Sequence, residues 1–571
     1  MNRQSRMTTF RWLYAAALLC WAGAGGAAVV WVAPSPGAWE DGANWSGGQP
    51  PGALDSVDIG AAADVSVSSA GNAAFELLTA GRLGASGGNL SVAGALTNAG
   101  TLDIQADATT TAGTLANQAA GAAKVTGANA RLEIAGHIDN AGSIELADGG
   151  FMTGASLLDS GIVAIAGAAN LMADQFVATA TGQLRISGAG SRIDVGGALS
   201  SAGILAATQQ GHVEAASLDT GLSMTLDLAA TLHTLSAINA ATSHWRLADD
   251  GTQANIAGST TNAGTIDIQS GASLQSGSID NVGTIDATDG GQAGADSAIN
   301  GSAGHLDVSG TGSRLAIAGN VTNHGTIDVG PAGTFEAGGV ANTASGVTDV
   351  HGDGAVADIA GTFDNAGSVR IAGAAALSAA RYGQFDGVTL LDAGSLAAPT
   401  VAITGGLLAG AGTVVGQLGI GPGARIEPGL IAGDAAVLDV DGDMVLSGIA
   451  LLDLGAAQFD LGAGAVGYDR IAVGGNLLLD GTLRIALAGS FTPKLGDFFD
   501  VFTAMIVALG NPAFELPALA AGLHWSGTVV DTATGEAFRL AVVPLPPAAL
   551  LAAVPLPVLL RLRRTVLRDR R

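Results

Sequence analysis

Aliphatic residues alternate with polar or small residues along most of the chain. In the stretches R-L-E-I (131–134) and T-I-D-I (265–268), every second residue is Leu or Ile, and the residues between them are polar. A period of two is typical of a β-strand with one buried face. The stretches are too short for helices, and many are followed by Asn-x-Gly, which allows a left-handed turn at low steric cost. The pattern therefore predicts short strands joined by tight turns.

Six such segments align without gaps through the middle of the chain, and each ends in a glycine. These glycines are separated by 42, 61, 61, 61 and 42 residues. An extra turn at residues 281–283 divides one interval of 61 into 19 and 42, so the unit is about 20 residues long. The Asn and Gly residues that mark the turns are Asn98, Gly100, Asn140, Gly142, Asn262, Gly264, Asn281, Gly283, Asn323, Gly325, Asn365 and Gly367.

A unit of this length cannot bury its apolar face alone, so it must stack on its neighbours. The chain is therefore predicted to be all-β, as a β-solenoid of the right-handed parallel β-helix type with coils of about 20 residues. Asn262 and Asn281, one coil apart, are expected to begin a stacked ladder. The expected regions are a signal peptide (1–28), a Trp-containing N-terminal cap (29–71), the repeat region (72–400), a C-terminal β-region (401–540) and a sorting tail (541–571).

The composition supports a long β-structure that contains few charged residues. The 571 residues include 87 Gly and are 48% hydrophobic, but only 13% are charged. Glycine without a three-residue period excludes collagen, and the abundant aliphatic residues oppose disorder. The net charge is −26, and Arg residues collect at the two ends, which argues against nucleic acid as a partner. The single cysteine, Cys20, lies in the N-terminal apolar segment and excludes a disulfide framework.

Both ends carry targeting signals. Residues 1–28 have a basic start, an apolar core and small residues after it, as a secretory signal peptide does. Residues 541–560 contain no charge and can just span a bilayer, although their prolines make a poor continuous helix. The basic residues expected to stay on the cytoplasmic side are Arg561, Arg563, Arg564, Arg568, Arg570 and Arg571.

The tail as a whole resembles a known class of sorting signal. Its motif of Val543, Pro544, Leu545 and Pro546, with the hydrophobic stretch and Arg-rich end, is similar to the V-P-L-P-A variant of the PEP-CTERM class. The resemblance implies that an exosortase-type membrane enzyme processes the chain near the motif during export to the surface of a Gram-negative bacterium. Bacteria with this class of tail often make extracellular polysaccharide. Pro547 stands where the class usually has Ala, and a nonspecific membrane anchor is the alternative.

The flanking regions resemble those of bacterial surface solenoids. The run W-E-D-G-A-N-W-S-G-G-Q-P-P (39–51) resembles their opening segment, and Y-D-R-I-A-V (468–473) resembles their closing β-region. We expect the tryptophans to form a hydrophobic cap, with sugar stacking as the alternative. The repeats themselves resemble autotransporter passengers.

A search for chemistry finds dispersed residues. The eight histidines match no metal or triad spacing, and Gly-rich matches at 84–88 and 462–467 lack the helix that such motifs require. The Asp-rich stretch 439–443 lacks the full order of a calcium loop. Catalytic residues, metal ligands and cofactors are therefore not predicted. We expect the aspartates after the repeat turns to line one face of the solenoid: Asp103, Asp267, Asp286 and Asp328.

These features favour an exported, non-catalytic solenoid that serves as a structural, adhesive or polysaccharide-associated scaffold at the cell surface or in the extracellular matrix. The partners expected are the export machinery, an exosortase-type enzyme, extracellular polysaccharide and, before processing, the membrane. One alternative is a carbohydrate-active β-helix enzyme, which requires carboxylates that converge in one cleft. Another is an autotransporter-type passenger lacking its translocator.

Overall fold

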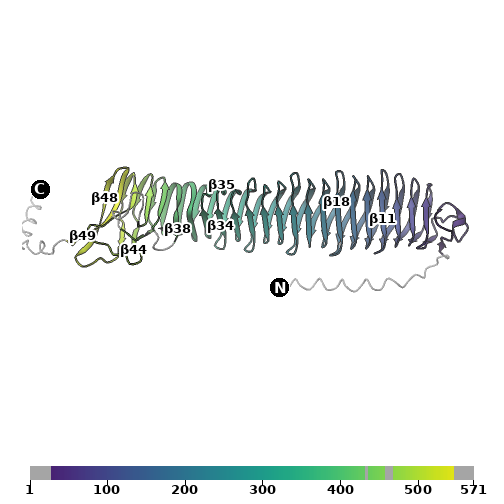
Figure 1. The fold of residues 1–571 in the computed structure, drawn as a ribbon, viewed down its shortest axis with the longest axis horizontal. Coiled ribbons are helices and arrows are strands. Elements are labelled where there is room, and N and C mark those ends of the chain that lie inside the picture. Colours follow the sequence, from purple (N-terminus) through teal and green to yellow (C-terminus); the bar gives the residue numbers. More distant parts are fainter. Residues whose placement is uncertain (1–27, 431–434, 457–466, 546–571) are drawn as a thin grey trace, which may run out of the picture. The chain divides into compact units, whose positions relative to one another are not determined.

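The computed structural model describes residues 28–430, 435–456 and 467–545, and the chain divides into two compact units between residues 260 and 261. Each unit is a stack of parallel β-coils, and about 19 coils of about 21 residues are present in all. Successive coils of each unit lie side by side and follow the colour order of Figure 1. The described residues contain one short 3-10 turn, η1 (Gly42–Asn44), and no α-helix. The predicted all-β solenoid is therefore confirmed.

The first unit begins with a small cap and continues as regular coils. The strands that form its cap, its outward columns and its surface hollow are β1 (Val29–Val30), β2 (Gly37–Ala38), β3 (Ser56–Ile59), β4 (Asp64–Val67), β7 (Arg82–Ala85), β8 (Asn89–Asn98), β9 (Thr101–Ile104), β10 (Thr109–Asn117), β11 (Ala122–Thr126), β12 (Arg131–Ile134), β14 (Ser143–Ala147) and β15 (Phe151–Asp159).

The second unit contains the most regular repeats. Its repeat strands are β26 (Thr265–Ile268), β27 (Ser273–Asn281), β28 (Thr284–Ala287), β29 (Gln292–Asn300), β30 (His305–Val308), β31 (Arg314–Asn323), β32 (Thr326–Val329), β33 (Thr334–Asn342), β34 (Val347–His351), β35 (Val356–Asn365), β36 (Ser368–Ala372), β37 (Ala376–Gln384) and β38 (Val388–Pro428).

Each repeat coil contributes one short and one long strand, which pair in parallel with their counterparts in the next coil. Thus β26 pairs with β28, and β27 pairs with β29. Equivalent residues come to lie about 4.8 Å apart. Ile266 and Ile285 stack in the buried interior, whereas Asp267 and Asp286 stack on the outer face. A residue type repeated at one position therefore becomes a continuous column.

The long strands are of two lengths. β29 and β33 have nine residues, whereas β31 and β35 have ten, and the register shifts where they pair. The extra residue forms a β-bulge. In β31 it lies between Ile317 and Asn320, where an added Cβ at Gly319 would be 2.5 Å from the carbonyl oxygen of Asp296. The alternation of coil lengths explains the spacings of 42 and 61 residues in the sequence.

Three tryptophans close the N-terminal end of the first unit. Trp39 and Trp45 are 0% and 2% exposed, and Trp31 is 8% exposed. The ring of Trp45 lies 5.0 Å from that of Trp31 and 4.9 Å from that of Trp39, in edge-on contacts. The Trp45 Nε1 donates to the carbonyl of Trp39 at 2.8 Å. Because the rings are buried, they are not placed to stack on a sugar.

Parallel coils continue into the C-terminal region before a hairpin changes the direction of the chain. β42 (Arg470–Val473) pairs in parallel with β45 (Phe498–Ala504). β48 (Leu523–Thr532) and β49 (Gly535–Pro544) then form an antiparallel hairpin, and β49 pairs antiparallel with β45. β48 and β49 are labelled at the yellow end of the chain in Figure 1.

Candidate functional site

The turn asparagines of the second unit form a buried ladder. Each Nδ2 donates to the side-chain oxygen one coil further along, at 2.7 Å from Asn262 to Asn281 and 2.9 Å from Asn281 to Asn300. The Asn281 Nδ2 also donates to the carbonyl of His305 at 3.0 Å. We call this set the amide ladder, and its members are Asn262, Asn281, Asn300, Asn323, Asn342, Asn365 and Gln384.

The ladder confirms the expected stacking of Asn262 and Asn281. The turn glycines were expected to provide a left-handed backbone conformation, and this expectation is wrong. The φ of Gly283 is not positive, and left-handed residues lie instead at another corner of the coil, such as Asp289 and Gly290. An added Cβ at Gly283 would be 2.0 Å from the carbonyl oxygen of Gly264. Gly100 and Gly142 are equally close to the preceding coil at 2.1 Å, so these turns need glycine for close approach.

The remaining turn residues follow the same pattern. Asn323 and Asn365 are 0% exposed, and an added Cβ at Gly325 or Gly367 would meet a carbonyl oxygen at 2.2 Å. In the first unit a shorter ladder runs from Asn98 through Asn117 and Asn140 to Asp159. Burial raises the pKa of Asp159, although it accepts hydrogen bonds from Asn140 and Gly161. The predicted turn residues are thus structural in both units.

The sequence analysis missed several ladder members. Asn117, Asn300 and Asn342 are not followed by Gly two residues later, so the turn motif did not reveal them. Their signal is spacing, because each lies 19 or 23 residues from the next amide in its ladder.

One outward column of the second unit consists of carboxylates. Asp267, Asp286, Asp307, Asp328 and Asp349 are successive register partners, and we call them the acidic column. Burial raises the pKa of Asp307 to about 6, and the neighbouring charge of Asp328 adds to this effect. The expected alignment of Asp267, Asp286 and Asp328 on one face is confirmed.

The acidic column ends at a basic residue. Arg370 is the register partner of Asp349, donates to its carboxylate at 3.3 Å and also donates to Asp392 at 3.1 Å. The His351 Nε2 lies 2.9 Å from the Asp328 Oδ1. The like charges between Asp267 and Asp328 therefore lie side by side in one stack.

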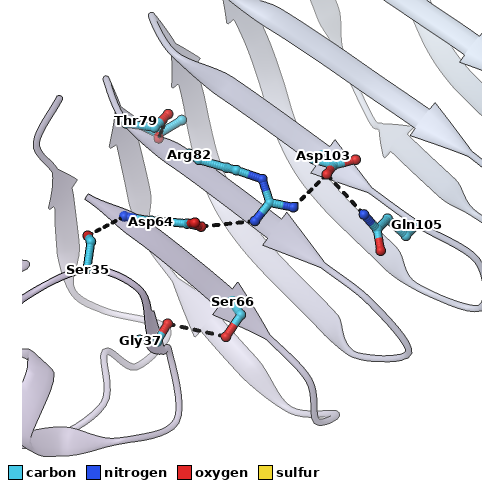
Figure 2. Close-up of polar contacts among 9 residues, drawn as sticks. Ser35, Gly37, Asp64, Ser66, Thr79, Arg82, Asp103 and Gln105 are labelled. Atoms are coloured by element: carbon cyan, nitrogen blue, oxygen red, sulfur yellow. Dashed lines mark hydrogen bonds and ion pairs between the residues drawn. The ribbon is translucent and has the colours of Figure 1, made fainter. Parts of the chain in front are cut away.

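The equivalent column of the first unit has alternating charges. Asp103 on β9 is followed by Lys124 on β11 and Glu145 on β14. As Figure 2 shows, Arg82 lies between two carboxylates, 2.9 Å from Asp64 and 2.7 Å from Asp103. Asp103, which we expected in the same row as the other aspartates, is therefore paired within its own unit.

The possible metal ligands and the Y-D motif were also followed in the described residues. The described residues contain no group of three or more His, Cys, Asp or Glu side chains placed to hold a metal ion. Asp469 is 1% exposed and accepts hydrogen bonds from the backbone N–H groups of Ala436 and Asp453 at 3.0 and 2.8 Å. Burial raises its pKa to about 7. This carboxyl joins three segments of the C-terminal region.

A surface hollow of about 420 Å³ in the second unit crosses β27, β29, β31, β33 and β35, and we call it the groove. In one outward column, Gly294 and Ala316 lie between Gln275 and the pair Glu336 and Asp358. The small residues leave the space, and the larger polar ones bound it. The groove residues used below are Gln275, Gln292, Gly294, Asp296, Arg314, Ala316, Ala318, Glu336 and Asp358.

Three carboxylates line this groove, and glycoside hydrolysis uses a pair of carboxylates. The Arg314 Nε and terminal nitrogen donate to Glu336 at 2.8 and 2.5 Å, and this pairing lowers the pKa of Glu336. The Asp358 Oδ1 accepts from the Ser378 hydroxyl at 2.6 Å. Hydrolysis needs a carboxylic acid whose pKa is raised. Glu336 lacks that property, so this carboxyl is poorly suited to donate a proton.

Half of the sorting motif lies at the end of the C-terminal hairpin. Val543 and Pro544 belong to β49 and face His524 and Leu523. The Leu545 N–H donates to the carbonyl of Gly522 at 2.8 Å, and Leu545 is 53% exposed. Pro546, the Arg cluster at 561–571 and residues 1–27 of the signal peptide lie outside the described residues.

Comparison with known proteins gives no family for this chain: neither a family model nor a curated protein matches it. Within the described residues, none of the helical structure is long and apolar enough to cross a membrane.

Proposed function

We propose that the protein is an exported, non-catalytic β-solenoid scaffold of the bacterial cell surface or extracellular matrix. The observation that carries this proposal is the placement of its polar side chains. Most of the ladder and acidic-column residues repeat from coil to coil, and the ladder is buried inside the solenoid. A scaffold requires such regularity, whereas an active site requires a few differentiated residues in one place.

The localisation rests on the two ends of the sequence. The signal-like N-terminus supports export, and the V-P-L-P motif followed by an Arg-rich end supports sorting by an exosortase-type enzyme. Val543 and Pro544 are held in β49, and Leu545 directly follows the end of that strand. Cleavage after Leu545 would therefore leave every described strand intact.

The test is to recover the protein from the cell surface and to identify its C-terminal peptide by mass spectrometry. A new C-terminus between Val543 and Pro547, with Arg571 missing, is the expected result. A surface protein that retains Arg571 would instead be held by a simple membrane anchor, and the sorting proposal would be withdrawn. Protein found only in the cytoplasm would overturn export itself.

The non-catalytic part of the proposal has its own test. The purified protein is incubated with neutral and uronate-containing polysaccharides, and new reducing ends and unsaturated uronates are measured. We expect no product above the level of a heat-denatured sample. Product that disappears in Asp296→Ala or Asp358→Ala, with the fold unchanged by circular dichroism, would make the chain an enzyme.

A further inference from the structure

The groove of the second unit is shaped for a long ligand. It crosses five long strands from successive coils, so its length follows the stacking direction of that unit. Its floor is formed by small residues, because Gly294 and Ala316 are register partners in adjacent coils. The Gln275 amide lies over Gly294, where an added Cβ would be 2.3 Å from its Oε1. A side chain at this position would displace the amide that borders the groove.

The walls of the groove offer both donors and acceptors. Gln275 and Gln292 present exposed amides, and Asp296 presents an exposed carboxylate. None of these three side chains is hydrogen-bonded to another described residue, whereas Arg314 and Glu336 are bonded to each other. Hydroxyl groups donate and accept at once, so they match a mixed set of amides and carboxylates.

The charges of the groove select against an anionic ligand. Asp296, Glu336 and Asp358 contribute three carboxylates, and Arg314 contributes one guanidinium. The chain as a whole has a net charge of −26, which also disfavours an anionic ligand. Uronates, sulfated sugars and nucleic acids would therefore be repelled.

An extended peptide is also a poor match. A peptide strand binds a sheet through an unpaired edge. The strands beneath the groove are paired on both sides, since β31 lies between β29 and β33, and β33 lies between β31 and β35. The groove therefore offers side chains to a ligand and no free strand edge.

A second hollow occurs at the equivalent place in the first unit. It has a volume of about 390 Å³, crosses β8, β10, β12 and β15, and is lined by Thr111, Gly113, Glu133, Ala135 and Thr153 among others. Its one charged lining residue, Glu133, lies 3.4 Å from Arg131 on the same strand. Each unit thus has a hollow with small and polar lining residues on its long strands.

From these observations we infer that the groove binds an extended, uncharged polysaccharide through its hydroxyl groups. This inference deepens the proposed function and rests on it only for the place where protein and polysaccharide meet. Gln275, Gln292 and Asp296 would hydrogen-bond the sugar hydroxyls, while Ala316 and Ala318 contact the apolar face of the sugar rings.

Affinity electrophoresis of the purified protein tests the inference, with hydroxyethyl cellulose, galactomannan, dextran or alginate in the gel. We expect retardation by at least one of the three neutral polymers and none by alginate. The double variant Gln275→Ala/Asp296→Ala removes two hydrogen-bonding groups and should bind about tenfold more weakly. Ala318→Met fills the groove and should have a similar effect.

Two matched variants distinguish the groove from the rest of the surface. Asp280→Ala and Ala341→Met alter exposed residues of the same strands outside the groove and should bind like the wild type. Unchanged melting temperatures for all variants verify folding. Retardation by no neutral polymer, or equal retardation of groove and control variants, would overturn the inference. So would alginate binding that the groove variants abolish.

These outcomes are separate from those that test the proposed function. Binding without surface localisation would contradict export while leaving the groove intact. Cleavage of the bound polymer would contradict the non-catalytic proposal but not the ligand class. A correctly sorted protein that binds no neutral polymer would contradict only the inference.

Discussion

At the scale of single residues, burial determines what each polar side chain can do. The amide of Asn281 is 0% exposed and is satisfied by Asn262, Asn300 and the carbonyl of His305. A buried amide without such partners would destabilise the fold, because its interactions with water have been lost. The ladder therefore fixes the register of neighbouring coils as well as joining them.

Replacing Asn281 by alanine should destabilise the second unit by about 3 kcal/mol, because two buried partners lose hydrogen bonds and a small cavity forms. Chemical denaturation followed by circular dichroism measures the change in the free energy of unfolding. Asp280→Ala, at the exposed neighbouring position, should change it by less than about 0.5 kcal/mol. Equal effects of the two variants would show that the ladder contributes nothing specific.

Asp307 gives the acidic column a defined pH dependence. Burial and Asp328, with a further effect of Asp286, raise its pKa to about 6 from 3.8, whereas His305 acts in the opposite direction. Protonation of Asp307 therefore stabilises the folded state, because the folded protein binds this proton more tightly than the unfolded chain does. This contribution is fully present below about pH 3.8 and is lost as the pH rises through 6.

We expect Asp307→Asn to raise the free energy of unfolding at pH 8, by on the order of 1 kcal/mol after allowance for solvent screening. The gain should shrink towards pH 4, where the aspartate of the folded wild type is protonated. Denaturation curves at the two pH values measure this difference, with Asp280→Asn as the control. A gain independent of pH would contradict the assigned cause.

At the scale of strands and coils, the sequence was most informative where one position repeats. Period-two alternation and the Asn-x-Gly spacing predicted strands, coil length and the alignment of Asp267 with Asp286, because parallel stacking turns sequence periods into columns. The groove was not predicted. It depends on which residues of β29, β31 and β33 become register partners, and the bulges change that register by one residue.

The N-terminal cap makes a prediction at this scale. Trp45 packs between Trp31 and Trp39, and β1 and β2 pair with the first-coil strands β3 and β4. Trp45→Ala should destabilise the cap by about 3 to 5 kcal/mol and expose the edges of β3 and β4. Calorimetry should show a lower melting temperature, and light scattering should show association. Val32→Ala, at a residue that is 60% exposed, should leave both unchanged.

At the scale of the whole molecule, the charge of −26 is distributed unequally among the outward columns of side chains. In the first unit, Arg82 and Lys124 lie next to carboxylates, whereas the acidic column has five consecutive carboxylates before Arg370 is reached. Salt screens attraction and repulsion alike. The two units should therefore respond differently to ionic strength.

Raising NaCl from about 10 mM to about 1 M shortens the Debye length from about 30 to 3 Å. The second unit should then gain stability, because repulsion within the acidic column is screened, while the first gains less because its ion pairs weaken. Hydrogen exchange with mass spectrometry measures the opening free energies of the two units separately in the intact chain. The double variant Asp286→Asn/Asp328→Asn should remove most of the extra response of the second unit, whereas Asp280→Asn should leave it. If both units respond equally in the wild type, repulsion along the acidic column is not what distinguishes them.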